Sequence, residues 1–203
     1  MNRLTILIIL IAISSYSFSQ SYDRSYLRND LTLSYGIPST DMFLSVQSNT
    51  LDDYFPDARY LRDNYSGTGV ISFTYRRVSN SEMFLWGASV SYNATNGKMY
   101  YLGNYEGELK RNFITVAFEG HYRYQNVNKV QLYSGIGIGY SMGNETLTPS
   151  GESGKTAVSG SINRIAYQIN AIGIRIGDNI GGFLELGYGY KGIVNAGLSI
   201  QLL

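Results

Sequence analysis

Hydrophobic and polar residues alternate with a period of two along most of the chain beyond residue 30. In 113–124, for example, apolar Ile114, Val116 and Phe118 alternate with Thr115 and other residues of mostly polar character. Successive side chains of a β-strand point to opposite faces of the sheet, so this pattern predicts strands with one apolar and one polar face. The same test predicts eight strands, at 31–37, 71–76, 84–93, 113–124, 130–142, 161–176, 184–190 and 194–202.

The strand predicted over 161–176 is less regular than the others. Ile165, Tyr167 and Ile169 share one parity, whereas Ile172 and Ile174 fall on the other. One extra residue in a strand shifts the parity of everything after it, so we expect a β-bulge near Ala171.

The two faces of the predicted strands differ in side-chain size. The polar faces carry mostly Gly, Ser, Thr and Asn, while the apolar faces are bulky and contain no charged residue. A soluble barrel or sandwich would point the apolar face inward and carry many Lys and Glu outside. Small polar residues suit a narrow lumen, bulky apolar ones suit hydrocarbon, and a membrane-spanning sheet must close. The expected fold class is all-β: a closed antiparallel up-and-down transmembrane β-barrel of about eight strands.

Predicted connections follow the pattern of such barrels, with long external loops and short periplasmic turns. The long ones are 38–68, 95–111 and 143–160, and all three prolines fall within them: Pro38, Pro56 and Pro149. The loop 38–68 is acidic and aromatic, and we interpret it as a surface cap; a partner-binding or cation-binding loop is the alternative.

Tyrosines are predicted to form two belts at the membrane boundaries, where amphipathic rings are favoured. The outer belt would comprise Tyr35, Tyr92, Tyr140, Tyr188 and Tyr190, and the inner belt Tyr75, Tyr122, Tyr124 and Trp86.

Composition supports the strand assignment and excludes several classes of function. The chain holds 19 Tyr and 23 Gly, and only 15% of its residues are charged, against about 25% in ordinary soluble domains. It has no Cys, which excludes disulfides and thiolate zinc sites. The formal net charge of +1 leaves no basic footprint for nucleic acid.

The first 19 residues are predicted to be a signal peptide. Arg3 precedes the apolar run 4–13, which is too short to cross a bilayer as a helix, and small residues such as Ser17 and Ser19 follow it. We therefore expect export, with 20–203 forming the barrel domain.

Candidate chemistry is sparse. The single histidine, His121, lies between Glu119 and Arg123 on the polar face, which could be an acid–base pair of a lipid-trimming barrel enzyme or a set of interior residues that satisfy one another. We favour the second reading and expect no catalytic residue, cofactor or metal site. Arg123, Arg175 and Glu185 are predicted to form an ion-pair network in the lower lumen, because buried charges need partners.

The last strand resembles the assembly signal of Gram-negative outer-membrane proteins through Asn195, Gly197, Ile200 and Leu202. Together with the run GFLELGYGYKGIVNAGLSIQLL, the chain is similar to the small outer-membrane β-barrel domain family. This resemblance implies fold and location rather than a particular activity.

The function we expect is that of a non-enzymatic integral protein of the cell outer membrane, with a structural or surface-interaction role through its external loops. Its expected partners are the lipid bilayer, lipopolysaccharide and the barrel assembly machinery, and we expect a monomer. The alternatives are a porin-like transport barrel, a lipid-modifying barrel enzyme, and a soluble periplasmic barrel that binds a hydrophobic ligand.

Overall fold

A computed structural model of the chain describes residues 28–39, 60–102, 104–127, 129–150 and 156–203. The predicted signal peptide and Pro56 lie outside these ranges. No helix in the described ranges is long and apolar enough to cross a membrane.

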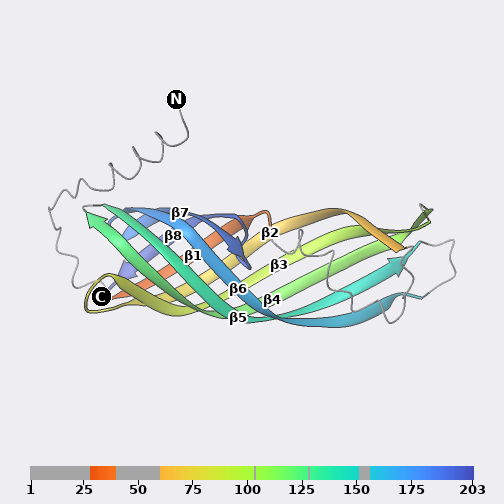
Figure 1. Cartoon of the computed structure of the whole chain (residues 1–203), viewed down its shortest axis with the longest axis horizontal. Coiled ribbons are helices and arrows are strands. Elements are labelled where there is room, and N and C mark those ends of the chain that lie inside the picture. Colours follow the sequence, from red (N-terminus) through yellow and green to blue (C-terminus); the bar gives the residue numbers. More distant parts are fainter. Residues whose placement is uncertain (1–27, 40–59, 103, 128, 151–155) are drawn as a thin grey trace, which may run out of the picture.

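Eight antiparallel strands form a closed barrel in which each strand pairs with its neighbours in sequence and the last pairs with the first (Figure 1). The strands are β1 (Asn29–Ile37), β2 (Tyr60–Val78), β3 (Phe84–Tyr101), β4 (Asn104–Val127), β5 (Val130–Pro149), β6 (Val158–Gly177), β7 (Ile180–Gly189) and β8 (Val194–Leu202). All eight predicted strands are present, and the fold is all-β as expected.

The apolar face of each strand points away from the barrel. Leu33 is 59% exposed, Phe118 55% and Ile138 65%, whereas their neighbours of opposite parity are mostly buried. We call the outward apolar surface from the level of Phe84 to the level of Met142 the apolar belt. Its large members include Leu33, Tyr35, Ile71, Phe73, Tyr75, Phe84, Trp86, Val90, Tyr92, Ile114, Val116, Phe118, Tyr122, Ile136, Ile138, Tyr140, Met142, Ile165, Tyr167, Ile169, Ile172, Leu184, Leu186, Tyr188 and Leu198.

The predicted bulge is confirmed in β6. The register of β6 with β7 shifts between Asn170 and Ile172, and its register with β5 shifts at the same level. One extra residue near Ala171 therefore lets isoleucines of both parities reach the outer face.

The barrel wall has unequal height. β1, β7 and β8 have 9, 10 and 9 residues, whereas β2–β6 have 18 to 24. In Figure 1 the long strands continue to the right beyond the end of β7. Two predicted long loops are therefore wrong: most of 95–111 and 143–160 is strand, and Pro149 ends β5. Residues 60–68 of the third predicted loop belong to β2, and 40–59 lie outside the described residues.

In the extension the polarity of the two faces is reversed. We call residues 94–101, 104–113, 143–149 and 158–164 of β3–β6 the upper sheet. Its outer face carries exposed polar side chains such as Lys98, Lys110 and Asn144. Its inner face buries Met99, Leu109 and Leu147, which form one apolar cluster. The extension thus has the inside-apolar pattern of a sheet in water, and this reversal is why the sequence pattern did not predict it as strand.

Candidate functional site

A buried ion pair crosses the centre of the lumen. Lys191 lies in the turn after β7, and its Nζ is 2.6 Å from Oε1 of Glu119 on β4. It also donates to Thr74 Oγ1 at 3.1 Å. Tyr190 OH donates to the same Glu119 oxygen at 2.6 Å and lies 3.0 Å from Ser89 Oγ. The short β7–β8 turn is thereby fastened to the opposite wall.

His121 lies beside this ion pair. Its Nε2 is 3.7 Å from Glu119 Oε2 and 3.4 Å from Asn170 Nδ2. Its ring packs edge-on against Tyr133, with centroids 5.6 Å apart. A Cβ on Gly135 would lie 2.1 Å from the imidazole Cδ2, so only glycine leaves room for the ring there. Packing and polar contacts therefore account for the position of His121.

A second group of charges fills the lumen nearer the short turns. Arg76 donates to Asp30 at 2.9 Å and approaches Glu185 at 3.8 Å. Glu185 also accepts from Tyr133 OH at 2.8 Å and from Asn195 Nδ2 at 2.9 Å. All five side chains are buried. Buried charges in such a network are stabilised because each lies beside an opposite charge or a hydrogen-bonding group.

The five residues predicted as a lumen cluster are all buried, but they contact one another less than the prediction implied. Glu119 and His121 lie together, as described above. Arg175 donates to Ser199 Oγ at 2.7 Å and to backbone carbonyls of the β6–β7 turn. Arg123 donates to the Glu82 carbonyl oxygen at 3.3 Å. The ion pair found for Glu185 is with Arg76 rather than with these two arginines.

Sequence reasoning missed the partners that complete these contacts: Asp30, Arg76, Tyr190 and Lys191. Parity contained part of the signal, because Arg76 alternates with the apolar residues of its strand and Lys191 shares the parity of Glu185. The prediction that Tyr190 belongs to the outer aromatic belt is wrong, because its hydroxyl points into the lumen onto Glu119. The other tyrosines of both predicted belts and Trp86 are exposed on the outer face.

Where the lumen is lined by described residues, their side chains leave little space. One internal cavity, bordered by Asn93, Thr115, Ser141 and Tyr190, has a volume of about 10 Å³, which is room for about one water molecule. Above it, Arg111 and Glu145 form a buried ion pair between β4 and β5. Within the described residues, no group of three or more His, Cys, Asp or Glu side chains could hold a metal ion.

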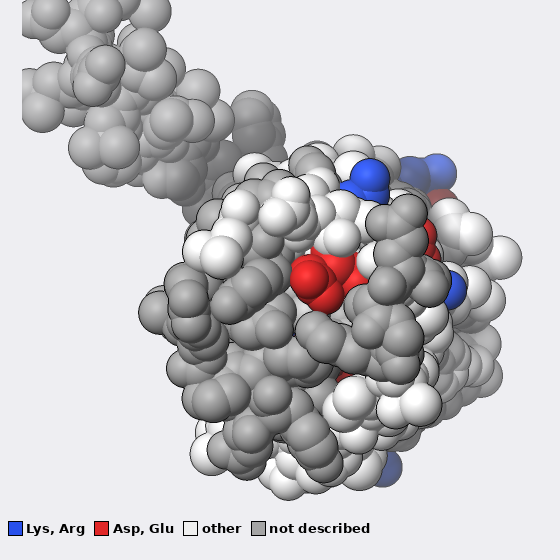
Figure 2. All heavy atoms as spheres, turned by 90° about the vertical axis from the view of Figure 1, so that its right-hand side faces the viewer, with Lys and Arg blue, Asp and Glu red and all other residues white. Residues whose placement is uncertain are grey.

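The end of the barrel that carries the tall strands exposes charge. Figure 2 views this end, with acidic side chains gathered near the middle of the face and basic ones towards its periphery.

The predicted C-terminal signal residues divide between the two faces of β8. Asn195 points inward to Glu185, and Ile200 and Leu202 are exposed outside. A Cβ on Gly197 would lie 2.1 Å from the Leu33 carbonyl oxygen, so β8 needs glycine where it approaches β1.

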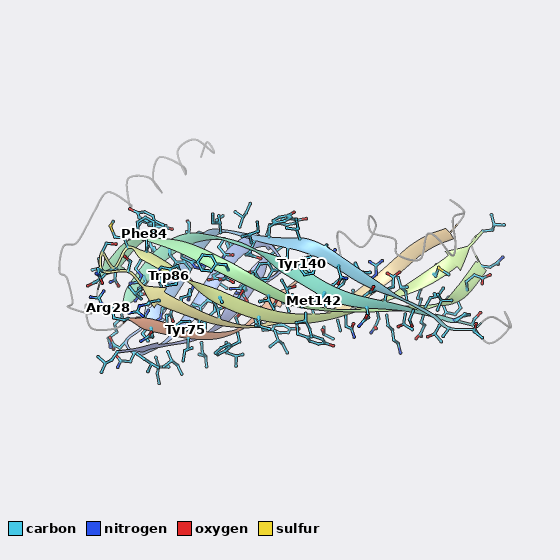
Figure 3. The ribbon with its side chains drawn as sticks, turned by 90° about the horizontal axis from the view of Figure 1, so that it is seen from below. Arg28, Tyr75, Phe84, Trp86, Tyr140 and Met142 are labelled. Carbon is cyan, nitrogen blue, oxygen red and sulfur yellow. The ribbon has the colours of Figure 1, made fainter. Side chains whose placement is uncertain are left out.

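The outer face is the other candidate site, because an apolar surface of this extent needs a partner. Figure 3 shows Tyr75, Phe84 and Trp86 towards one end of the barrel and Tyr140 and Met142 further along, with side chains projecting away from the ribbon.

Neither a scan against protein-family models nor a search of curated proteins finds a match to this chain.

Proposed function

We propose that this protein is an integral β-barrel of the bacterial outer membrane, exported by its N-terminal segment, with a structural or surface-interaction role rather than an enzymatic one. The observation that carries the proposal is the polarity step on the outer face of three neighbouring strands, β3, β4 and β5, where apolar side chains give way to polar ones at one level. Membership of the small outer-membrane β-barrel family is part of this proposal.

The step lies at matched positions in the register. Tyr92, Ile114 and Met142 are paired across β3, β4 and β5, and beyond them the outer face carries no exposed large apolar residue until Leu102 and Tyr105 at the tip of the β3–β4 hairpin. Asn112 and Asn144 lie two residues nearer the tips of β4 and β5, and they are paired with each other and exposed. A soluble sheet has no reason to change polarity at one height, whereas the edge of a hydrocarbon layer provides one.

The height of the belt supports the same proposal. On β3 the outward face runs from Phe84 to Tyr92, nine residues in all, and a tilted strand needs about 9–11 residues to cross a bilayer. At the other end, exposed Lys129 and Asp178 form an ion pair at 2.9 Å, as expected for a surface in water. The upper sheet would then stand outside the membrane, where it meets lipopolysaccharide and other surface partners.

The alternatives fit the geometry less well. A soluble barrel with a hydrophobic ligand requires inward apolar faces, whereas the belt points outward. A transport barrel requires an open lumen, and an eight-stranded barrel has an interior about filled by side chains. The ion pair of Glu119 with Lys191 lies across that path. For a lipid-modifying enzyme, no nucleophile lies within the contacts found for His121.

The test is fractionation of cells that express the full chain, followed by electrophoresis of heated and unheated samples. We expect recovery in the outer membrane and a faster-migrating unheated band, because a closed barrel stays compact in detergent. A polar substitution at the step, Asn112→Ser, serves as a matched control for the belt substitution Phe118→Arg, which is expected to reduce recovery. Quantitative recovery of the wild type in the soluble periplasm would overturn the proposal.

A further inference from the structure

A groove of about 630 Å³ interrupts the outer face in the part of the apolar belt nearer the short turns. Trp86 and Tyr122 form part of one wall, and Ile136 lies on the other. Gly120 lies between Trp86 and Ile136 in the register of β3, β4 and β5, and a second small residue, Ala171, lies on β6 beside Ser134, where other belt positions carry large side chains. A Cβ added at Gly120 meets nothing within 4 Å, so the hollow reaches the backbone of β4.

The bottom of the groove is formed by the backbone of β4 at Gly120 and, further round the barrel, by the bulge in β6. The bulge places Ala171, a small residue, on the outer face beside Ser134 of β5. The Ser134 hydroxyl donates to the Ala171 carbonyl oxygen at 2.7 Å, which satisfies a backbone group at the bulge. The Ser134 hydroxyl and the Ala171 carbonyl oxygen are thus already hydrogen-bonded to each other. An apolar ligand can therefore cover them without breaking a hydrogen bond to water.

We infer that the groove binds one acyl chain of a membrane lipid. The inference rests on the proposed function, which places the apolar belt in hydrocarbon. The residues that line the groove include no Asp, Glu, Lys or Arg, and the polar ends of His121 and Asn170 are buried in contact with each other, so the groove presents no exposed charge to a headgroup. Its volume lies within the range of about 300–1,000 Å³ found for ligand sites. A thin flexible chain can follow a hollow between a wall of rings and a wall of isoleucine, and gains dispersion contacts along both.

A second copy of the protein fits the groove less well. A symmetric dimer brings the same patch of both subunits together. Two hollows would then face each other and leave a void, whose lining loses its contacts. The acyl chain is therefore the occupant we propose, and a dimer is an outcome that the experiment detects.

The test uses the full chain refolded in phosphatidylcholine vesicles that contain a small fraction of phosphatidylcholine with a diazirine in one acyl chain. After illumination, cross-linked peptides are mapped by mass spectrometry. We expect several-fold more labelling at Gly120–Tyr122 and Ile169–Ala171 than at Leu184–Leu186, another stretch of the belt. Gly120→Leu fills the groove and should abolish this preference.

Gly182→Leu is the matched control. Gly182 is exposed on β7, and a Cβ there has only the Gly197 carbonyl oxygen nearby, at 3.9 Å. This variant should keep the preference. Trp86, the single tryptophan, gives a second measurement on the wild type alone. Lipids with brominated acyl chains should quench its fluorescence more than their mole fraction in the vesicle predicts for random contact.

The outcomes separate the inference from the function on which it rests. Even labelling of the whole belt in heat-modifiable, membrane-inserted barrels, with quenching in proportion to mole fraction, overturns the groove and leaves the membrane proposal intact. Cross-links between two copies at the groove also overturn it. Protein that stays in the aqueous phase with no belt peptide labelled contradicts the proposed function itself.

Discussion

Removal of the Lys191 ammonium tests whether ion pairs in the lumen contribute to the free energy of unfolding of the barrel. Lys191→Met keeps most of the side-chain volume and deletes the contacts of Nζ with both carboxylate oxygens of Glu119, at 2.6 and 2.7 Å. It also removes the hydrogen bond to Thr74. Glu119, which is 1% exposed, would then be a buried carboxylate without its cation.

Loss of one partner from a buried ion pair typically costs about 3–5 kcal/mol. Tyr190 still donates to Glu119 in the variant, so we expect the lower end of that range, about 3 kcal/mol. This corresponds to a roughly hundredfold change in the unfolding equilibrium. The double variant Glu119→Gln with Lys191→Met removes both charges and should recover most of the loss, because no uncompensated charge remains.

The assay is urea unfolding of the full chain in lipid vesicles, followed by the emission of Trp86 and by heat modifiability. Lys129→Met is the matched control, because Lys129 forms an exposed ion pair with Asp178 and its side chain is 67% accessible. Exposed pairs contribute about 0–1 kcal/mol. Equal losses for Lys191→Met and Lys129→Met, or a double variant no more stable than Lys191→Met, would refute the reasoning.

Three further predictions follow from the belt, the rim and the lumen. Phe118→Arg, at mid-belt, should cost about 2–4 kcal/mol in the same urea titration, whereas Asn112→Arg, beyond the polarity step, should leave the midpoint unchanged. Gly36→Ala should destabilise the barrel by about 1–3 kcal/mol, because its Cβ would lie 1.8 Å from the Lys191 carbonyl oxygen; Gly182→Ala should not shift the midpoint. In planar bilayers the wild type should show no steady conductance, and long-lived open channels would contradict a filled lumen.

The sequence predicted the fold wherever one face of a strand was uniformly apolar. Parity alone located all eight strands and the bulge near Ala171, because burial on one side of a sheet imposes a period of two. It failed in the upper sheet, because the outer face there is polar, the reverse of the pattern that marks the strands below it. Pairing with neighbouring strands holds those segments extended, and a single strand's pattern does not report its neighbours.

For the lumen, the sequence predicted which residues point inward but not which of them pair with one another. Parity indicates that Glu119, His121 and Glu185 point inward, but the partner of each depends on how the strands are staggered around the barrel. Arg76 and Glu185 lie on β2 and β7, and their meeting follows from closure of the whole sheet. Tyr190 and Lys191 belong to a turn, where the period of two ends, so alternation gave the wrong face for Tyr190 although Lys191 keeps the parity of Glu185.

The order of strands has a consequence for the kinetics of folding. Seven of the eight ladders join consecutive strands, whereas the remaining ladder pairs Asn29–Ile37 with Val194–Leu202 at opposite ends of the described chain. Pairings so distant in sequence form slowly, because loop-closure entropy must be overcome before any contact is gained. Until that seam closes, β1 and β8 each present an unpaired edge on which another chain could add a strand. The rate at which the two ends meet therefore sets how long the nascent sheet is open to misassembly.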